Sequence, residues 1–325
     1  MMKEHVFVSA IIYARNNEKE ISKTLESIDT VLNKTFINYE IVIVNDFSED
    51  KTLQIIRNTI PSLRGNIIVI NLSRKHGVEN AMMAGLNKSM GDFVYEFDSA
   101  IIDYNIDLIP QLYKKAVTGF DIVSASTELS SSFSKLFYKV INRISYLDLD
   151  LGTERIRLVT RRALNAMLCL KEKVRYRKAL YAYTGYAKAK VEFLSTGNYP
   201  QKKLNRENVA LALDVLVSFS NFGLRISHYL SFLFFFFSIF MLGYSVYNYV
   251  FNRNVVEGWT TIMILISTGF AGLFFIIGML GEYISRILIE SQNRPFYSTK
   301  SVELYKEKPG AKNNAEAEVA VTNSI

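Results

Sequence analysis

The stretch Glu40–Thr52, EIVIVNDFSEDKT, contains the unit from which the fold is built. Its first part, Glu40–Val44, is an apolar strand that ends in Asn45-Asp46, and a helical pattern follows over Asp50–Arg57. The same alternation runs through residues 1–125. Further strands are predicted at Val6–Ile12, Asn66–Leu72 and Phe93–Phe97, and further helices over Glu18–Leu32, over Val78–Lys88 and from Ile106. Strands separated by helices predict an α/β fold with a mostly parallel, doubly wound sheet.

Polar residues follow the ends of these strands, namely Asn16, Asp46, Arg74 and Asp98. In such a sheet ligands bind at the carboxyl ends of the strands. Asp98 is the strongest candidate because it ends an apolar strand in the stretch YEFDSAIIDY, residues 95–104, which also holds Asp103. A turn or helix-capping role is the alternative for Asp46, and a helix N-terminal acid is the alternative for Asp103.

The composition excludes several classes of protein. The 325 residues include one cysteine, Cys169, so no intrachain disulfide forms. The three histidines are widely spaced and give no zinc pattern. Neither a nucleotide-binding P-loop nor the glycine signature of dinucleotide enzymes occurs. The net charge of +7 suits anionic lipid or phosphorylated substrates, and together with the hydrophobic pattern described next it argues against nucleic acid as a partner.

Two uncharged stretches, 226–250 and 258–281, are long enough for helices that cross roughly 30 Å of hydrocarbon. The alternative is a pair of buried core helices. Basic residues flank the pair on its outer sides, whereas the short join has only Arg253. This bias predicts a two-helix transmembrane hairpin with both termini in the cytosol, in the cytoplasmic (inner) membrane. Glycines in the second stretch allow close helix packing and hence a homo-oligomer.

The rest of the chain is divided accordingly. Residues 1–205 are predicted to form the cytosolic α/β domain, 206–225 a juxtamembrane helix and 282–325 a cytosolic tail, of which 309–325 is disordered. Within the first domain, residues 132–147 have an apolar helical face and a basic stripe. This pattern favours an interfacial helix on anionic lipid, with a core-facing helix as the alternative.

Several segments in order resemble one family. They are SAIIYARNNE (9–18), IVIVNDFSEDKT (41–52), LSRKHGVENAMMAGLNKSMGD (72–92), LALDVLVSFS (211–220) and GEYISRI (281–287). The chain is similar to family-2 glycosyltransferases of the membrane-bound polyprenyl-phosphate type, the bactoprenol glucosyltransferase and dolichol-phosphate mannose synthase group. The likeness extends over residues 5–297.

The resemblance implies a GT-A (Rossmann-like) domain that moves a sugar from a nucleotide-sugar donor to polyprenyl phosphate, with inversion, at the cytoplasmic membrane face. It implies an Asp-x-Asp motif that holds Mg²⁺ or Mn²⁺ on the donor diphosphate. The implied donor-binding residues are Asn16, Glu18, Asp46, Ser48, Arg74 and Asp98. The implied catalytic residues are Asp98, Arg155 and Arg157, with Arg157 and Lys202 for the acceptor phosphate, and Asp98, joined by Asp103, for the metal.

The sequence departs from the family at the acidic positions. The family's Asp-Ala-Asp-Leu-Gln-Asp is here residues 98–103, DSAIID, so that Ala100 replaces the second acid. Arg155 stands where the family has a catalytic-site Asp, beside Glu154.

Two hypotheses follow from these departures. In the first, the chain is a working transferase in which Arg15, Arg74 or Arg155 replaces part of the metal's charge, or in which Asp103 or Glu154 completes a shifted metal site. In the second, it is a catalytically inactive relative that serves as a membrane partner or scaffold subunit. A flippase-like binding protein ranks below both.

Overall fold

The computed structural model describes residues 3–127, 154–170, 176–193, 258–291 and 295–305, together with scattered positions between 229 and 251. These residues belong to two compact units. The first unit holds the residues up to 193 and those from 295 onward, and the second holds those between 229 and 291. The predicted segments 132–147, 206–225 and 309–325, and the predicted site residue Lys202, lie outside the described residues.

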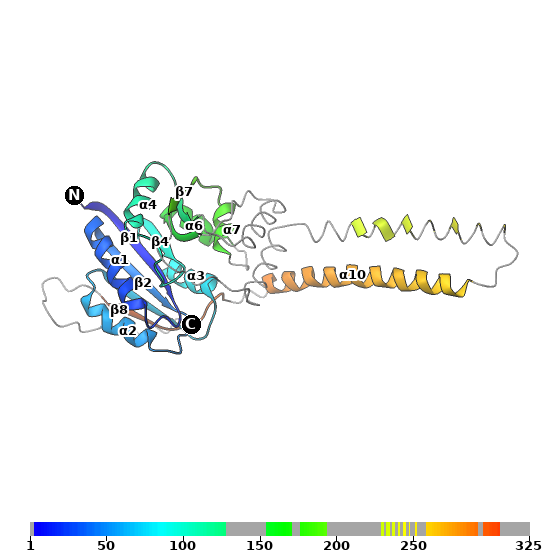
Figure 1. Ribbon diagram of the computed structural model, residues 1–325, viewed down its shortest axis with the longest axis horizontal. Coiled ribbons are helices and arrows are strands. Elements are labelled where there is room, and N and C mark those ends of the chain that lie inside the picture. Colours follow the sequence, from blue (N-terminus) through cyan, green and yellow to red (C-terminus); the bar gives the residue numbers. More distant parts are fainter. Residues whose placement is uncertain are drawn as a thin grey trace. The chain divides into compact units, whose positions relative to one another are not determined.

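The first unit is built on an eight-stranded sheet with the strand order β7-β5-β6-β4-β1-β2-β3-β8 (Figure 1). The strands are β1 (Glu4–Ala14), β2 (Phe36–Asn45), β3 (Asn66–Leu72), β4 (Phe93–Phe97), β5 (Ile122–Thr127), β6 (Glu154–Thr160), β7 (Lys188–Phe193) and β8 (Thr299–Tyr305). The four central strands, β3-β2-β1-β4, are parallel. β6 and β8 pair antiparallel with β4 and β3. The predicted α/β fold class is therefore confirmed, with a mixed sheet around a parallel centre.

Helices cover both faces of this sheet. They are α1 (Ile21–Thr35), α2 (Thr52–Thr59), the 3-10 turn η1 (Ile60–Ser62), α3 (Val78–Lys88), α4 (Leu108–Val117), α6 (Arg161–Cys169) and α7 (Arg177–Tyr183). The bounds of β3, α3 and β4 agree with the sequence prediction, whereas β1 and β2 are longer than predicted. The backbone N–H and C=O groups at the ends of these interior strands form hydrogen bonds with the neighbouring strands. The strands therefore extend beyond the apolar residues that predicted them.

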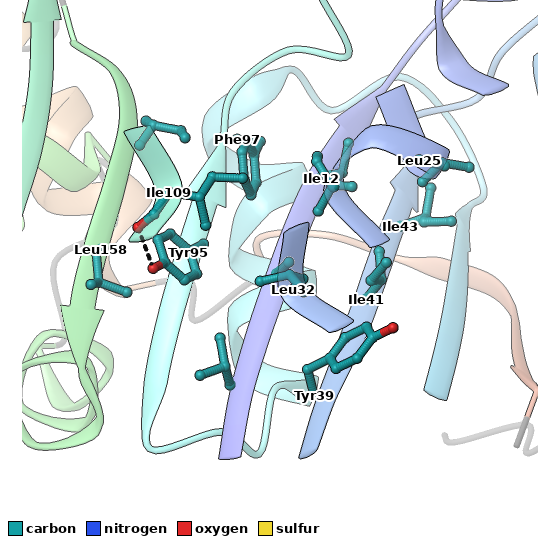
Figure 2. Close-up of a cluster of buried hydrophobic side chains, with 14 of the residues drawn as sticks. Ile12, Leu25, Leu32, Tyr39, Ile41, Ile43, Tyr95, Phe97, Ile109 and Leu158 are labelled. Carbon is teal, nitrogen blue, oxygen red and sulfur yellow. Dashed lines mark hydrogen bonds between the residues drawn. The ribbon is translucent and has the colours of Figure 1, made fainter. Parts of the chain in front are cut away.

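One face of the sheet forms the main hydrophobic core, drawn in Figure 2. Alternate residues of β1 and β2, such as Ile12 and Ile43, pack there against Leu25 and Leu32 of α1. The Tyr95 hydroxyl donates to the Ile109 carbonyl oxygen at 2.7 Å, which satisfies the one polar group of that side chain inside the core. Intervening residues point to the opposite face, where α3 packs.

Gly85 shows how tightly α3 packs on that opposite face. A Cβ atom at Gly85 would lie 2.4 Å from the Ile11 side chain and 2.9 Å from Val44. Only glycine therefore allows α3 to approach β1 and β2 so closely.

β8 comes from the segment predicted as a cytosolic tail. It pairs antiparallel with β3, and Glu303 at its centre is only 5% exposed. Two nitrogens of Arg57 on α2 donate to the Glu303 carboxylate, at 2.6 and 3.1 Å, and Asn71 of β3 donates to it at 2.8 Å. These charge-assisted bonds fix the last strand to the sheet edge.

Replacing Glu303 with alanine is expected to release β8 locally, because Asn71 and Arg57 lose their shared acceptor. Backbone amide exchange over residues 299–305 should accelerate by about tenfold or more, equivalent to 1.4 kcal/mol. Lys300→Ala, on the same strand but exposed, is the control and should exchange like the parent protein. Equal exchange in both variants would contradict the anchoring role of Glu303.

The second unit contains α10 (Trp259–Ser291), a helix of 33 residues. Large apolar side chains are exposed along it, including Ile266, Phe270, Phe274 and Ile287. Gly272 of α10 lies against Phe234, whose ring a Cβ atom at position 272 would meet at 2.2 Å. Within the part of the chain that the structure describes, no helix has both the length and the hydropathy of a membrane span.

Candidate active site

The strand order reverses beside β1, with β2 on one side and β4 on the other. The parallel strands β1 to β4 end at Ala14, Asn45, Leu72 and Phe97. At such a switch point the connections leave the sheet in opposite directions and expose the carboxyl ends of the strands to a ligand. Asn16, Asp46, Arg74 and Asp98 follow these ends, so the fold brings the predicted residues to one edge.

Two turns meet at the ends of β1 and β2. Asn16, which has a φ of 50°, receives the Glu49 backbone N–H at 2.9 Å and donates its own N–H to the Ser48 hydroxyl at 3.2 Å. The Glu18 carboxylate receives the backbone N–H of Lys51 at 3.3 Å. The predicted donor-binding residues Asn16, Glu18 and Ser48 thus hold the two turns together through the backbone.

Asp46 organises the loop that precedes α3. Its carboxylate is fully buried and receives the backbone N–H groups of His76 at 2.7 Å and Gly77 at 2.9 Å, and the Tyr13 hydroxyl at 3.1 Å. Gly77 has a φ of +82°, which favours glycine at this N-terminal cap of α3. The carboxylate therefore fixes the loop that carries Arg74.

Two arginines stand near these turns. Arg74 is exposed in the loop after β3. The Arg15 side chain is 21% exposed, lies 3.9 Å from the Glu49 carboxylate and donates to the Asp46 carbonyl oxygen at 3.4 Å. Both residues follow strand ends, Arg15 that of β1 and Arg74 that of β3, and guanidinium groups there suit the binding of a phosphorylated ligand.

Asp98 is held by an arginine that the sequence prediction missed. Arg177, the first residue of α7, donates to the Asp98 carboxylate at 2.6 Å, and its side chain is 1% exposed. The same guanidinium binds Glu79 of α3 at 2.9 Å and also binds Glu96 of β4. One buried cation therefore joins α3, β4 and α7.

A second buried arginine completes this cluster. Arg157 of β6 forms ion pairs with Glu96 and with Glu154, and its side chain is 6% exposed. The Tyr181 hydroxyl donates to Glu96 at 2.5 Å. Burial opposes ionisation of Arg157, but Glu154 and Glu96 outweigh it and raise its pKa. Arg157 is thus committed to internal carboxylates and is not presented to solvent.

Burial works to raise the pKa of the Asp98 carboxyl, but the charges of Arg177 and Arg157 outweigh it and lower that pKa to about 2. A carboxyl whose folded-state pKa is depressed stabilises the fold above its unfolded pKa of about 3.9, and this contribution is lost as the pH falls towards the folded value.

Asp98→Asn should accordingly be less stable than the parent protein at neutral pH. The difference in unfolding free energy should shrink as the pH falls from about 4 towards 2, because the parent loses the ion pair over that interval. Denaturant unfolding across this range measures it. A difference that stays constant with pH would contradict an ionised Asp98 in the fold.

The two other positions of the acidic motif, 100 and 103, are also buried and contact groups of the same chain. Ala100, where the family pattern has its second acid, is fully buried in the main core, and the Thr24 hydroxyl donates to its carbonyl oxygen at 2.5 Å. The Asp103 side chain is 2% exposed and pairs with Arg155 at 3.2 Å. Arg155 and Asp103 therefore stabilise one another below the tip of β4.

The acidic residues of this motif are paired with guanidinium groups. Mg²⁺ takes oxygen ligands and usually keeps several waters, with one or two carboxylates and the substrate phosphates completing its coordination. Among the described residues, no group of three histidine, cysteine or acidic side chains is placed to hold a metal. Asp98 and Asp103 each face a guanidinium group instead.

Glu96 and Arg177 show what sequence patterns could and could not signal. Glu96 is a charged residue inside an otherwise apolar strand, which indicates a buried ion pair. Arg177 lies 79 residues beyond Asp98, and nothing in its local sequence indicates where it will fold.

The comparisons with known proteins agree with this architecture. Residues 9–181 match the family model described as Glycosyl transferase family 2. An uncharacterized glycosyltransferase of Synechocystis is 31% identical over 299 residues, covering 89% of this chain and 93% of that protein. The bactoprenol glucosyl transferase of Shigella phage SfX is 29% identical, covering 90% of this chain and 99% of that protein.

A solved structure matches the fold. Glucosyl-3-phosphoglycerate synthase from Mycobacterium tuberculosis, crystallised with Mn²⁺, uridine diphosphate and glucosyl-3-phosphoglycerate, superposes with a TM-score of 0.50 at 16% identity. The match covers 66% of this chain and 80% of that one.

The fold is an α/β domain of the GT-A class. The chain belongs to glycosyl transferase family 2 and is a glycosyltransferase.

Proposed function

We propose that this chain transfers a sugar from a nucleotide-sugar donor to a polyprenyl phosphate at the cytoplasmic face of a membrane. The observation that carries the proposal is the likeness to bactoprenol glucosyl transferases along nearly their whole length, because it includes the uncharged stretches as well as the α/β domain. A lipid-linked acceptor suits a chain in which two uncharged stretches, 226–250 and 258–281, follow the α/β domain in the sequence.

The donor is proposed to bind at the strand-end edge. Asn16, Glu18, Asp46 and Ser48 shape the turns that receive it, and Arg74 lies at the rim. In the fold neighbour the bound nucleotide is uridine diphosphate, which makes a nucleoside diphosphate the leaving group to test first. The acceptor phosphate oxygen attacks the anomeric carbon, and the bonding pair of the sugar–oxygen bond leaves with the diphosphate.

The same geometry limits the roles of two predicted residues. Arg157 is tied to Glu96 and Glu154 inside the protein, so it is proposed to position the tip of β4 and not to touch the acceptor. Arg155 is tied to Asp103 in the same way. Lys202 remains the proposed acceptor-phosphate residue.

The stretches 226–250 and 258–281 are proposed to insert in the membrane as a hairpin with both chain ends in the cytosol. Exposed apolar side chains support the insertion, and open glycine positions support packing against a second copy of the chain. Apolar side chains are exposed on both segments, for example Phe236 and Phe274, and would lie against lipid. A Cβ atom at Gly269, Gly278 or Gly281 would meet nothing within 4 Å, so these positions are open to a second copy of the chain.

The test is a transfer assay on the full chain in membranes. Radiolabelled UDP- and GDP-sugars are supplied with undecaprenyl phosphate, and label extractable into organic solvent is counted. The expected result is a labelled lipid that depends on both the chain and the phosphorylated lipid. No labelled lipid with any donor would contradict the proposal and favour the inactive partner subunit.

A further inference from the structure

Five carboxylates gather around the tip of β4 and the start of β6; we call them the acidic tip. They belong to Glu79, Glu96, Asp98, Asp103 and Glu154. The fold neighbour was crystallised with Mn²⁺, a divalent cation, as well as uridine diphosphate. The number of acids alone would suggest that this chain also binds one.

Every carboxylate of the acidic tip is paired with a guanidinium group of the same chain. Arg177 binds Glu79, Glu96 and Asp98, Arg157 binds Glu96 and Glu154, and Arg155 binds Asp103. Lys178 adds positive charge that acts on Asp98 and Glu154. A divalent cation that bound these carboxylates would compete with the guanidinium groups already paired with them.

Displacement of Arg177 or Arg157 would be costly because both guanidinium groups are buried. The side chains of Arg177 and Arg157 are 1% and 6% exposed. Separating a buried ion pair leaves an uncompensated charge in a medium of low polarity. In addition, the position of the second motif acid is occupied by Ala100, which lies inside the core. No carboxylate is present there to bind a cation together with Asp98.

We propose that this chain binds the diphosphate of its donor without a divalent cation, because internal guanidinium groups already pair with every carboxylate of the acidic tip. The inference rests on the proposed function for its donor. The positive charge that meets the diphosphate comes from Arg15 and Arg74, at the ends of β1 and β3. Guanidinium groups bind phosphate oxygens with paired, directed hydrogen bonds and so replace a metal in this role.

Two measurements on the purified full chain in detergent test the proposal. The first is calorimetric titration with UDP and with GDP, once in EDTA and once in excess Mn²⁺. The dissociation constant of the bound nucleotide is expected to agree within about threefold between the two conditions. The second is electron paramagnetic resonance of free Mn²⁺, whose signal should not diminish when the protein is added without nucleotide.

Variants locate the positive charge. Arg15→Ala and Arg74→Ala should each weaken nucleotide binding about tenfold in EDTA. Lys34→Ala, an exposed cation in the last turn of α1, is the control and should bind as the parent protein does. Equal binding by all three variants would overturn the assignment to Arg15 and Arg74.

The outcomes separate the inference from the proposed function. Binding at least tenfold tighter in Mn²⁺ than in EDTA, or loss of the free Mn²⁺ signal, would overturn the inference and leave the proposed function standing. No binding of either nucleotide in either condition would overturn both.

Discussion

Replacing Arg177 with methionine is expected to lower the free energy of unfolding of the α/β unit by about 3–5 kcal/mol. Arg177 forms ion pairs with Glu79, Glu96 and Asp98, and its side chain is 1% exposed. Methionine keeps an unbranched chain of similar length, so the loss reports the charge and its hydrogen bonds more than the packing. The midpoint of thermal unfolding should fall by roughly 10 °C.

The control for this variant is Arg162→Met. Arg162 also pairs with one aspartate, Asp121, but its side chain is 67% exposed. Surface ion pairs contribute between about 0 and 1 kcal/mol, so this variant should unfold close to the parent protein. Acid should partly rescue Arg177→Met, because protonation removes the unpaired negative charges. A loss below about 1 kcal/mol, similar to that of the control, would contradict the central role of Arg177.

Restoring the family acid with Ala100→Asp is expected to destabilise the protein and not to create a metal site. Ala100 is fully buried among apolar side chains, and a carboxylate there would lose its hydration without gaining a charged partner. We expect a loss of about 3 kcal/mol or more in the free energy of unfolding. Titration with Mn²⁺ should show no new binding.

Ser99→Asp is the matched control for that variant. Ser99 is the preceding residue, is half-buried, and its hydroxyl receives the Ile101 backbone N–H at 3.1 Å. An aspartate can keep that hydrogen bond and reach solvent, so its effect should stay within about 1 kcal/mol. An Ala100→Asp protein as stable as the control, with tight Mn²⁺ binding, would show that position 100 opens toward the tip.

The sequence predicts the parallel centre of this fold well because its signals are local. β3, α3 and β4 begin and end where their apolar periodicity begins and ends. The residues at the strand ends follow directly, since parallel strands place their carboxyl ends at one edge. β8 could not be predicted in the same way, because a short strand at Thr299–Tyr305 becomes one only by pairing with the edge of β3.

The site is predicted less completely than the fold. The sequence identifies Asp98 and the substituted position Ala100, but it does not show which cations face them. Arg177 reaches Asp98, Glu96 and Glu79 only through the packing of α7 against the rest of the unit. The family pattern alone would assign Asp98 to a metal, whereas its actual partner is an arginine from a distant part of the chain.

The transfer reaction after chelation tests the central claim most directly. The full chain in membranes is treated with EDTA, and the rate of sugar transfer to undecaprenyl phosphate is compared with the rate after Mn²⁺ is restored. If Arg15 and Arg74 supply the positive charge in place of a metal, the two rates should agree within about threefold. A loss of about a hundredfold or more in EDTA that Mn²⁺ reverses would show that a divalent cation takes part and would contradict the account.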